Sequence, residues 1–117
     1  MSKKKLVPEH YNKGKPAMEM VPFNALLSVA DVMGYGETKY VRKSPDELNY
    51  LHGKGVEPKE LLAGAMRHIA KYMLGQEYDD ESGMHHIAHA ASDCMMALEV
   101  IYKRKGQNIK TLRKNDK

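Results

Sequence analysis

A histidine-rich stretch between residues 85 and 93 holds the side chains best suited to chemistry. His86, His89 and Asp93 follow one another at spacings of three and four, and His85, His89 and Asp93 at spacings of four. In a helix, either set lies along one side. Such a set can bind a metal ion or a phosphate. The plain structural alternative is a polar helix face with partly buried, hydrogen-bonded histidines.

Three carboxylates, Asp79, Asp80 and Glu81, come shortly before these histidines. Carboxylate oxygens are the ligands that hard cations such as Mg²⁺ and Mn²⁺ prefer. A histidine pair four residues apart can also bind Zn²⁺, but no cysteine or second clear histidine pair completes a tetrahedral set. We therefore expect Mg²⁺ or Mn²⁺, with Zn²⁺ as the alternative.

Two further segments carry residues that suit a phosphorylated ligand. Arg67 and His68 are adjacent beside an apolar stripe, where they can contact a phosphate, although Arg67 could equally pair with an acid of a neighbouring helix. In the other segment, two glycines precede Glu37, Lys39 and Tyr40. Glycines before a helix N-terminus can cradle an anion. This second segment offers Glu37 to a metal, Lys39 to a phosphate, and Tyr40 for stacking or a hydrogen bond.

The elements that must position these residues are helices, since no stretch shows sustained β alternation. We expect a first helix from residue 23, interrupted at 34–36, with a short helical piece at 37–40. A loop with one helical turn follows at 43–57. Pro58 opens a second helix that stops at Gly75, and Ser82 caps a third that ends at Gly106. The expected apolar faces are Phe23, Leu26, Leu27, Ala30 and Val32 or Met33; Leu61, Leu62, Ala65, Met66, Ile69, Ala70 and Met73; and Ile87, Ala90, Ala91, Cys94, Met95, Leu98 and Ile101.

The charge is unevenly distributed along the 117 residues, which suffice for one domain. Residues 1–15 carry a net +4 and residues 103–117 a net +6, whereas residues 16–102 carry −6. An acidic body is a poor nucleic-acid-binding surface but suits a domain that gathers cations. We expect a flexible basic segment at 1–15, an all-α nucleotide-binding domain at 16–105 and a flexible basic tail at 106–117.

Cellular context and assembly follow from the same composition. A lone cysteine, Cys94, requires no oxidising compartment, and no apolar run is long enough to span a bilayer. We expect a cytoplasmic protein with neither a membrane nor a nucleic-acid partner. Because the few expected helices make a narrow core, we also expect a homo-oligomer, a dimer or a tetramer, to complete the bundle.

Taken together, four segments resemble the N-terminal domain family of the dATP/dGTP diphosphohydrolases. This family is common in phages, includes MazZ-type enzymes and is related to the MazG-like all-α nucleotide pyrophosphatases. The resemblance covers roughly residues 13–102. Its most specific part is the Glu-Ser-Gly string at 81–83 followed by His-x-x-His-Ala at 86–90. The segments are Lys13 to Pro22, Gly34 to Tyr40, Leu62 to His68, and Asp79 to Ala90.

The resemblance implies an α-helical, MazG-like oligomer that hydrolyses a purine (deoxy)nucleoside triphosphate to the monophosphate and pyrophosphate with Mg²⁺ or Mn²⁺. Classical MazG-like enzymes hold metal with two helical Glu-x-x-Glu/Asp pairs. Here the residue three positions after Glu37 is Tyr40 rather than an acid, and the later pair consists of His86 and His89. Asp93 stands where an amide is expected. By position, the resemblance implies catalytic roles for Glu37, His68 and Glu81; substrate contacts for Lys15, Lys39, Tyr40, Arg67 and His86; and metal contacts for Glu37, Glu81, His89 and Asp93.

Two other kinds of protein stay open at this point. The incomplete carboxylate pairs fit a protein that sequesters a nucleotide or cyclic nucleotide without cleaving it, such as a phage protein acting against host immune signalling. A plain helical adaptor is the third reading, and it predicts that no nucleotide raises the melting temperature.

Overall fold

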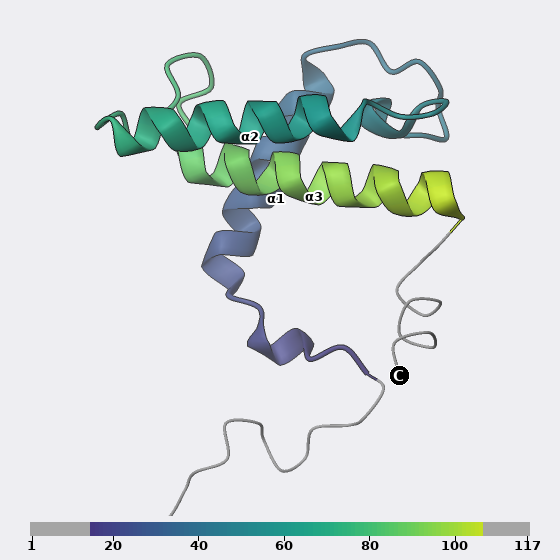
Figure 1. Ribbon diagram of the computed structural model, residues 1–117, viewed down its shortest axis with the longest axis horizontal. Coiled ribbons are helices and arrows are strands. Elements are labelled where there is room, and N and C mark those ends of the chain that lie inside the picture. The colour runs from purple at the N-terminus through teal and green to yellow at the C-terminus, as the bar shows by residue number, and fades with distance from the viewer. Residues whose placement is uncertain (1–14, 107–117) are drawn as a thin grey trace, which may run out of the picture.

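Three helices account for most of the described part of the chain (Figure 1). The computed structural model describes residues 15–106, in which α1 spans Phe23–Thr38, α2 spans Pro58–Met73 and α3 spans His86–Lys105. Of two short 3-10 turns, η1 at Met18–Met20 precedes α1, and η2 at Asn49–Leu51 lies between α1 and α2. Within the described residues no β-strand forms, which confirms the all-α prediction. The segments expected to be flexible lie outside this range, except for Lys15 and Gly106.

Local signals fix both ends of α2 and the end of α3. Pro58 occupies the first turn of α2, and Gly75, with a φ of +105°, follows its end. Gly106 ends α3 in the left-handed conformation, with a φ of +65°. Glycine adopts these angles without the steric strain of a Cβ. All three boundaries agree with the prediction.

The start of α3 differs from the prediction. The cap is His85, whose Nδ1 accepts a hydrogen bond from the Ile87 amide at 3.0 Å. Ser82 instead lies in the preceding turn, where its Oγ accepts the Met84 amide at 3.1 Å. The backbone of Tyr78 pairs with that of His85 across this turn, so α3 begins after His85 rather than directly after Ser82.

The expected break in α1 is also absent. Gly34 and Gly36 both lie inside the helix, which runs without interruption to Thr38. Glycine lowers helix stability by about 1 kcal/mol relative to alanine but does not by itself end a helix. The two glycines therefore lie in the last turns of α1 rather than before a helix N-terminus, and the anion cradle predicted there does not form.

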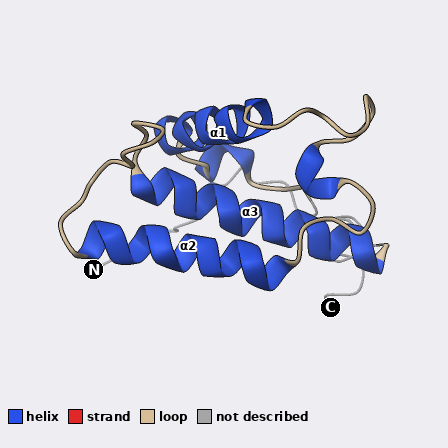
Figure 2. Cartoon of the chain, turned by 90° about the horizontal axis from the view of Figure 1, so that it is seen from above, coloured by secondary structure: helices blue, strands red, loops and turns tan. Residues whose placement is uncertain are grey.

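Helix α3 lies between α1 and α2 (Figure 2), and α2 and α3 pack along most of their lengths. Small residues allow this close approach, because a Cβ at Gly64 of α2 would come within 3.0 Å of the Asp93 carboxylate on α3. The buried apolar residues are correspondingly small: Val29, Val32, Ala65, Ala88, Ala90, Ala97 and Val100.

Many residues expected on the buried faces are exposed. Phe23 and Leu27 near the start of α1 are 66% and 63% exposed, and Met66 and Met73 of α2 are 69% and 74% exposed. The N-terminal half of α1 projects away from the α2–α3 pair (Figure 1), which explains the first two. The helical spacing was correctly identified, but one chain buries only part of each apolar face.

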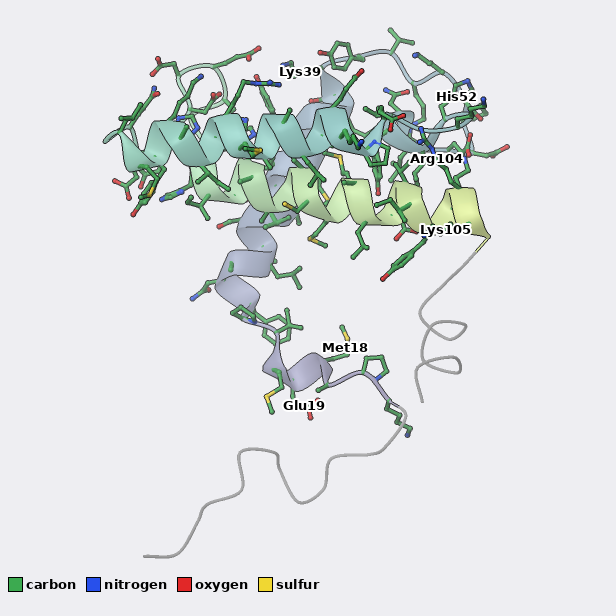
Figure 3. The ribbon with its side chains drawn as sticks, viewed as in Figure 1. Met18, Glu19, Lys39, His52, Arg104 and Lys105 are labelled. Atoms are coloured by element: carbon green, nitrogen blue, oxygen red, sulfur yellow. The ribbon has the colours of Figure 1, made fainter. Side chains whose placement is uncertain are left out.

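The last turn of α3 holds the loop between α1 and α2. Arg104 donates hydrogen bonds to the carbonyl oxygens of Lys54 and Gly55, at 2.8 and 3.2 Å, and to the Glu57 carboxylate. Lys103 pairs with the Glu47 carboxylate. Figure 3 shows Arg104 at this end of the α2–α3 pair, close to His52 of the loop. Because this loop forms one wall of the cavity described below, α3 fixes the shape of that wall.

Candidate functional site

A cavity of about 660 Å³ opens where the end of α1, the loop at 39–56, the turn at 79–82 and α3 meet. This volume is within the range of small-molecule sites. Val32, Leu48, Val56 and Met96 give it apolar walls. Seven of the residues predicted from the sequence line it: Glu37, Lys39, Tyr40, His68, Glu81, His89 and Asp93.

Three predicted residues do not line this cavity. Lys15 lies exposed at the start of the described chain, and Arg67 is exposed on α2. His86 has no exposed surface and lies behind the cavity wall. These three side chains are therefore not placed to contact a ligand in the cavity.

Lys39 supplies positive charge to the cavity. Its Nζ lies 3.2 Å from the Glu81 carboxylate, and it also lies over the rings of Tyr35 and Tyr40, 5.6 and 5.9 Å from their centroids. The hydrogen bond to Glu81 raises the pKa of Lys39, so the ammonium group stays charged. An ammonium group in an open pocket is suited to a phosphate oxygen.

Glu37 holds the loop in place. One of its carboxylate oxygens lies 3.3 Å from Arg42 Nε, and the other accepts the Asn49 amide at 3.0 Å. Both oxygens are thus occupied by protein donors. The arrangement ties the end of α1 to the 3-10 turn η2, which is a positioning role rather than that of a free metal ligand.

Three histidines from α2 and α3 meet at the cavity wall, where His68 and His89 line the cavity and His86 lies behind them. The Nδ1 atoms of His68 and His86 are 2.8 Å apart, a hydrogen-bond distance. The ring of His68 also stacks on that of His89, with centroids 4.4 Å apart, and His89 Nε2 lies 2.7 Å from Ser82 Oγ. Burial lowers the pKa of both His68 and His89. The neighbouring imidazoles lower the pKa of His68 further, so its neutral form is favoured.

Asp79 completes this cluster, and sequence reasoning did not single it out. Its Oδ2 accepts the amides of Glu81 and Ser82, at 3.1 and 2.8 Å. Burial alone would raise the pKa of Asp79, but the hydrogen bonds from Ser82 and the charges of His89 and His68 together lower it, and the net pKa is lowered. The carboxylate therefore stays ionised. The sequence signal for this turn was an aspartate three residues before Ser82 and four residues before Gly83. Gly83 closes the turn with a φ of +73°.

Ligand atoms of His68, Asp79 and His86 all lie within 4.8 Å of one another. Within residues 15–106, they form the one group of three or more potential ligands that is close enough to share an ion. Glu37, Glu81, His89 and Asp93, the residues assigned to metal from the sequence, are not brought together in such a group. Part of this difference arises because Glu81 pairs with Lys39 and Glu37 pairs with Arg42, so both carboxylates already have a cationic partner.

Asp93 is a half-buried carboxyl group in the cavity wall. Burial raises its pKa to about 6, although the charge of Arg67 acts in the opposite direction. Gly64 leaves the space for this carboxylate between α2 and α3. At neutral pH the cavity therefore holds a carboxylate that is poorly compensated by the protein.

Comparison with known proteins places this sequence in a family. The family model described as "dATP/dGTP diphosphohydrolase, N-terminal" matches residues 8–110. A protein of Salmonella phage PMBT28 named dATP/dGTP diphosphohydrolase is 30% identical over 94 residues, which cover 80% of this chain and 30% of the phage protein. The chain thus spans about a third of that relative's length. No solved structure matches the chain. Since the family model covers most of the sequence, including every residue that lines the cavity, the chain belongs to the dATP/dGTP diphosphohydrolase N-terminal family.

Proposed function

We propose that the chain is a metal-dependent purine deoxynucleoside triphosphate pyrophosphohydrolase, which converts a dNTP and water to a dNMP and pyrophosphate. The observation that carries this proposal is the composition of the cavity. Lys39, His68, Asp79, Glu81 and His89 line it together with apolar side chains such as Val32, Leu48 and Met96. A triphosphate with an attached purine likewise has both charged and apolar parts. The names of the family and of its phage relative support this substrate class.

The reaction requires a water oxygen to bond to the α-phosphorus while the bond from that phosphorus to the α–β bridging oxygen breaks. Pyrophosphate then leaves with the bonding electron pair. We propose that Glu81 accepts the proton of the attacking water. This cavity carboxylate pairs with Lys39 and with no other cation in the described part of the chain. Lys39 in turn is free to exchange Glu81 for a phosphate oxygen. Glu37 of α1 and Tyr40 of the following loop line the same cavity.

A divalent cation such as Mg²⁺ or Mn²⁺ neutralises triphosphate charge and lowers the pKa of bound water. The carboxylates predicted as its ligands do not converge in this structure, whereas His68, Asp79 and His86 do. His68 and Asp79 also line the cavity, so an ion held by this group would face a ligand bound there.

One observation favours a second function. Both oxygens of Glu37 are held by protein donors, and Glu81 is held by Lys39, so few carboxylates are free for catalysis. A protein of this kind could bind and sequester a nucleotide without cleaving it. This alternative predicts a bound nucleotide that is recovered intact.

The experiment that tests both is mass-resolved product analysis of a mixed dNTP and NTP pool incubated with the full chain and Mg²⁺ or Mn²⁺. Glu81→Gln is compared with Asp80→Asn, because the two residues are neighbours but only Glu81 lines the cavity. We expect purine monophosphate and pyrophosphate from the unmodified chain and from Asp80→Asn, and at least a hundredfold less from Glu81→Gln. An unchanged pool together with a nucleotide-dependent rise in melting temperature would establish sequestration. An unchanged pool with no such rise would refute both proposals.

We also propose that the chain forms a homo-oligomer, a dimer or a tetramer. The exposed apolar side chains on the outer faces of the helices support this, because burial of such side chains stabilises an interface. Among the most exposed are Phe23, Leu27, Met66, Met73, Met95 and Leu98. Helices α2 and α3 are antiparallel and α1 is oblique to them. All three have exposed apolar surface that a second copy can cover.

A further inference from the structure

We propose that His68, Asp79 and His86 bind one transition-metal ion of the Zn²⁺ class in preference to the Mg²⁺ expected from the sequence. The proposal concerns ion binding alone, so it stands or falls independently of whether the chain cleaves nucleotides.

The three ligands come from separate segments that the fold brings together. His68 lies on α2, Asp79 in the turn before α3, and His86 in the first turn of α3. Their ligand atoms already lie within 4.8 Å of one another. Two nitrogens on one zinc ion at bond lengths of about 2.0–2.1 Å are roughly 3.0–3.4 Å apart at octahedral to tetrahedral angles. The Nδ1 atoms of His68 and His86, now 2.8 Å apart, would have to separate by only about half an ångström.

The donor set determines the class of ion. Two imidazoles and one carboxylate form the ligand set of many catalytic zinc sites, and the same set with open positions binds Fe²⁺. Magnesium prefers oxygen ligands throughout and retains several waters. Two of the three donors here are nitrogens, which favours Zn²⁺, Co²⁺, Ni²⁺ or Fe²⁺ over Mg²⁺.

The surroundings of the ligands hold them in place without an ion. Two backbone amides bind Asp79 Oδ2, and His89, itself hydrogen-bonded to Ser82, stacks on His68. Outer contacts of this kind orient metal ligands and raise affinity. The turn at 79–84 is closed by backbone hydrogen bonds between Asp79 and Met84 and between Gly83 and Asp79, each 2.8 Å long.

His86 is the most deeply buried of the three ligands. Its side chain is completely buried, yet its Nε2 has no hydrogen-bond partner among the described residues. A buried imidazole with one hydrogen bond is costly to maintain, because each polar group removed from water needs a partner. Coordination through Nδ1 would replace the hydrogen bond with His68 by a bond to the ion and would leave Nε2 without a partner.

The position of the cluster also indicates an ion that a ligand can reach. His68 and Asp79 line the cavity, whereas His86 closes the site from behind. Three protein ligands leave at least one position free, as in catalytic rather than structural zinc sites.

The test is metal binding by the full chain after removal of metal with EDTA. Zn²⁺, Co²⁺ and Mg²⁺ are added separately, and we measure bound metal per chain by mass spectrometry, the visible absorption of Co²⁺, and the melting temperature. We expect one Zn²⁺ or Co²⁺ per chain, a Co²⁺ spectrum of low coordination number, and a clear rise in melting temperature. Mg²⁺ at the same concentration should leave the melting temperature unchanged.

Variants show whether these ligands hold the ion. His68→Gln and Asp79→Asn should each weaken Zn²⁺ binding at least tenfold, while His52→Gln, which changes an exposed histidine of the loop, should bind as the unmodified chain does. His86→Ala is left out because a fully buried side chain can be needed for folding. Zn²⁺ binding that is equal in all three variants, or Mg²⁺ binding as tight as that of Zn²⁺, would overturn the proposal. Pyrophosphate release is not measured here, so loss of the enzymatic proposal leaves this result unaffected.

Discussion

Replacing Asp93 with asparagine should stabilise the protein, although it removes a charge from a polar cavity. Burial raises the pKa of this carboxyl from 3.8 to about 6. That change corresponds to about 3 kcal/mol against the ionised form, at 1.36 kcal/mol for each factor of ten in proton affinity. Since the side chain is only half-buried, solvent screening reduces the effect, and we expect about 1.5 kcal/mol. Asparagine keeps the shape without the charge.

The sign of the pH dependence follows from the same pKa. Between pH 3.8 and 6 the folded chain binds more protons at Asp93 than the unfolded chain does, so the free energy of unfolding falls as pH rises through this window. Below pH 3.8 the carboxyl is protonated in both states and Asp93→Asn should be nearly neutral. Above pH 6 the full gain should appear, raising the melting temperature by about 6–10 °C.

The measurement is thermal unfolding of both proteins at pH 4 and pH 8 in EDTA, with Asp80→Asn as an exposed control. A melting temperature that falls in Asp93→Asn at pH 8 would refute the reasoning, because it would mean that the ionised carboxylate makes a favourable contact, for example with Arg67. Repeating the pH 8 measurement with Mg²⁺ tests the metal role predicted for Asp93. If Mg²⁺ raises the melting temperature of the unmodified chain but not that of Asp93→Asn, then Asp93 contributes to binding the ion.

Three further outcomes follow from the structure. Arg104→Met should lower the melting temperature by several degrees and speed proteolytic cleavage within 43–57, since it removes three hydrogen bonds to that loop; an unchanged cleavage rate in limited proteolysis would contradict this. Lys39→Met should weaken dNTP binding about tenfold or more in calorimetry with little change in melting temperature, because its pair with Glu81 is largely exposed; a fall in stability without loss of affinity would argue for a purely structural role. Met73→Glu should reduce self-association in sedimentation experiments, with Lys59→Glu, an exposed polar position on the same helix, as the control; equal effects of both would show that net charge rather than apolar contact controls assembly.

The parts of the fold that could be predicted from the sequence depend on neighbours in the chain. Pro58, Gly75 and Gly106 act on the backbone at their own positions, so the limits they set hold whatever packs nearby. The start of α3 could not be predicted in this way. Ser82 has the chemistry of a cap, but its hydroxyl is used by Met84 and His89 instead, and this depends on how the turn folds back.

The same distinction applies to the site. Helical spacing correctly placed the histidines of α3 near one another, and His89 and Asp93 both line the cavity. Spacing could not show that His86 is buried behind the cavity and faces His68 of another helix. Asp79 was named from the sequence only as one of three consecutive carboxylates, because its role comes from a turn, where no periodicity identifies which side chain points inward.

Gly34 and Gly36 have a consequence for how selectivity can evolve. Both line the cavity within a regular helix, and a Cβ at either position would meet no atom within 4 Å. Alanine there would strengthen the helix by about 1 kcal/mol at each position. Larger side chains at these positions would narrow the space available to a ligand with no strain on the backbone. The size of molecule accepted can therefore change in single mutational steps that preserve or improve folding, which makes the end of α1 a natural place for relatives to diverge in what they bind.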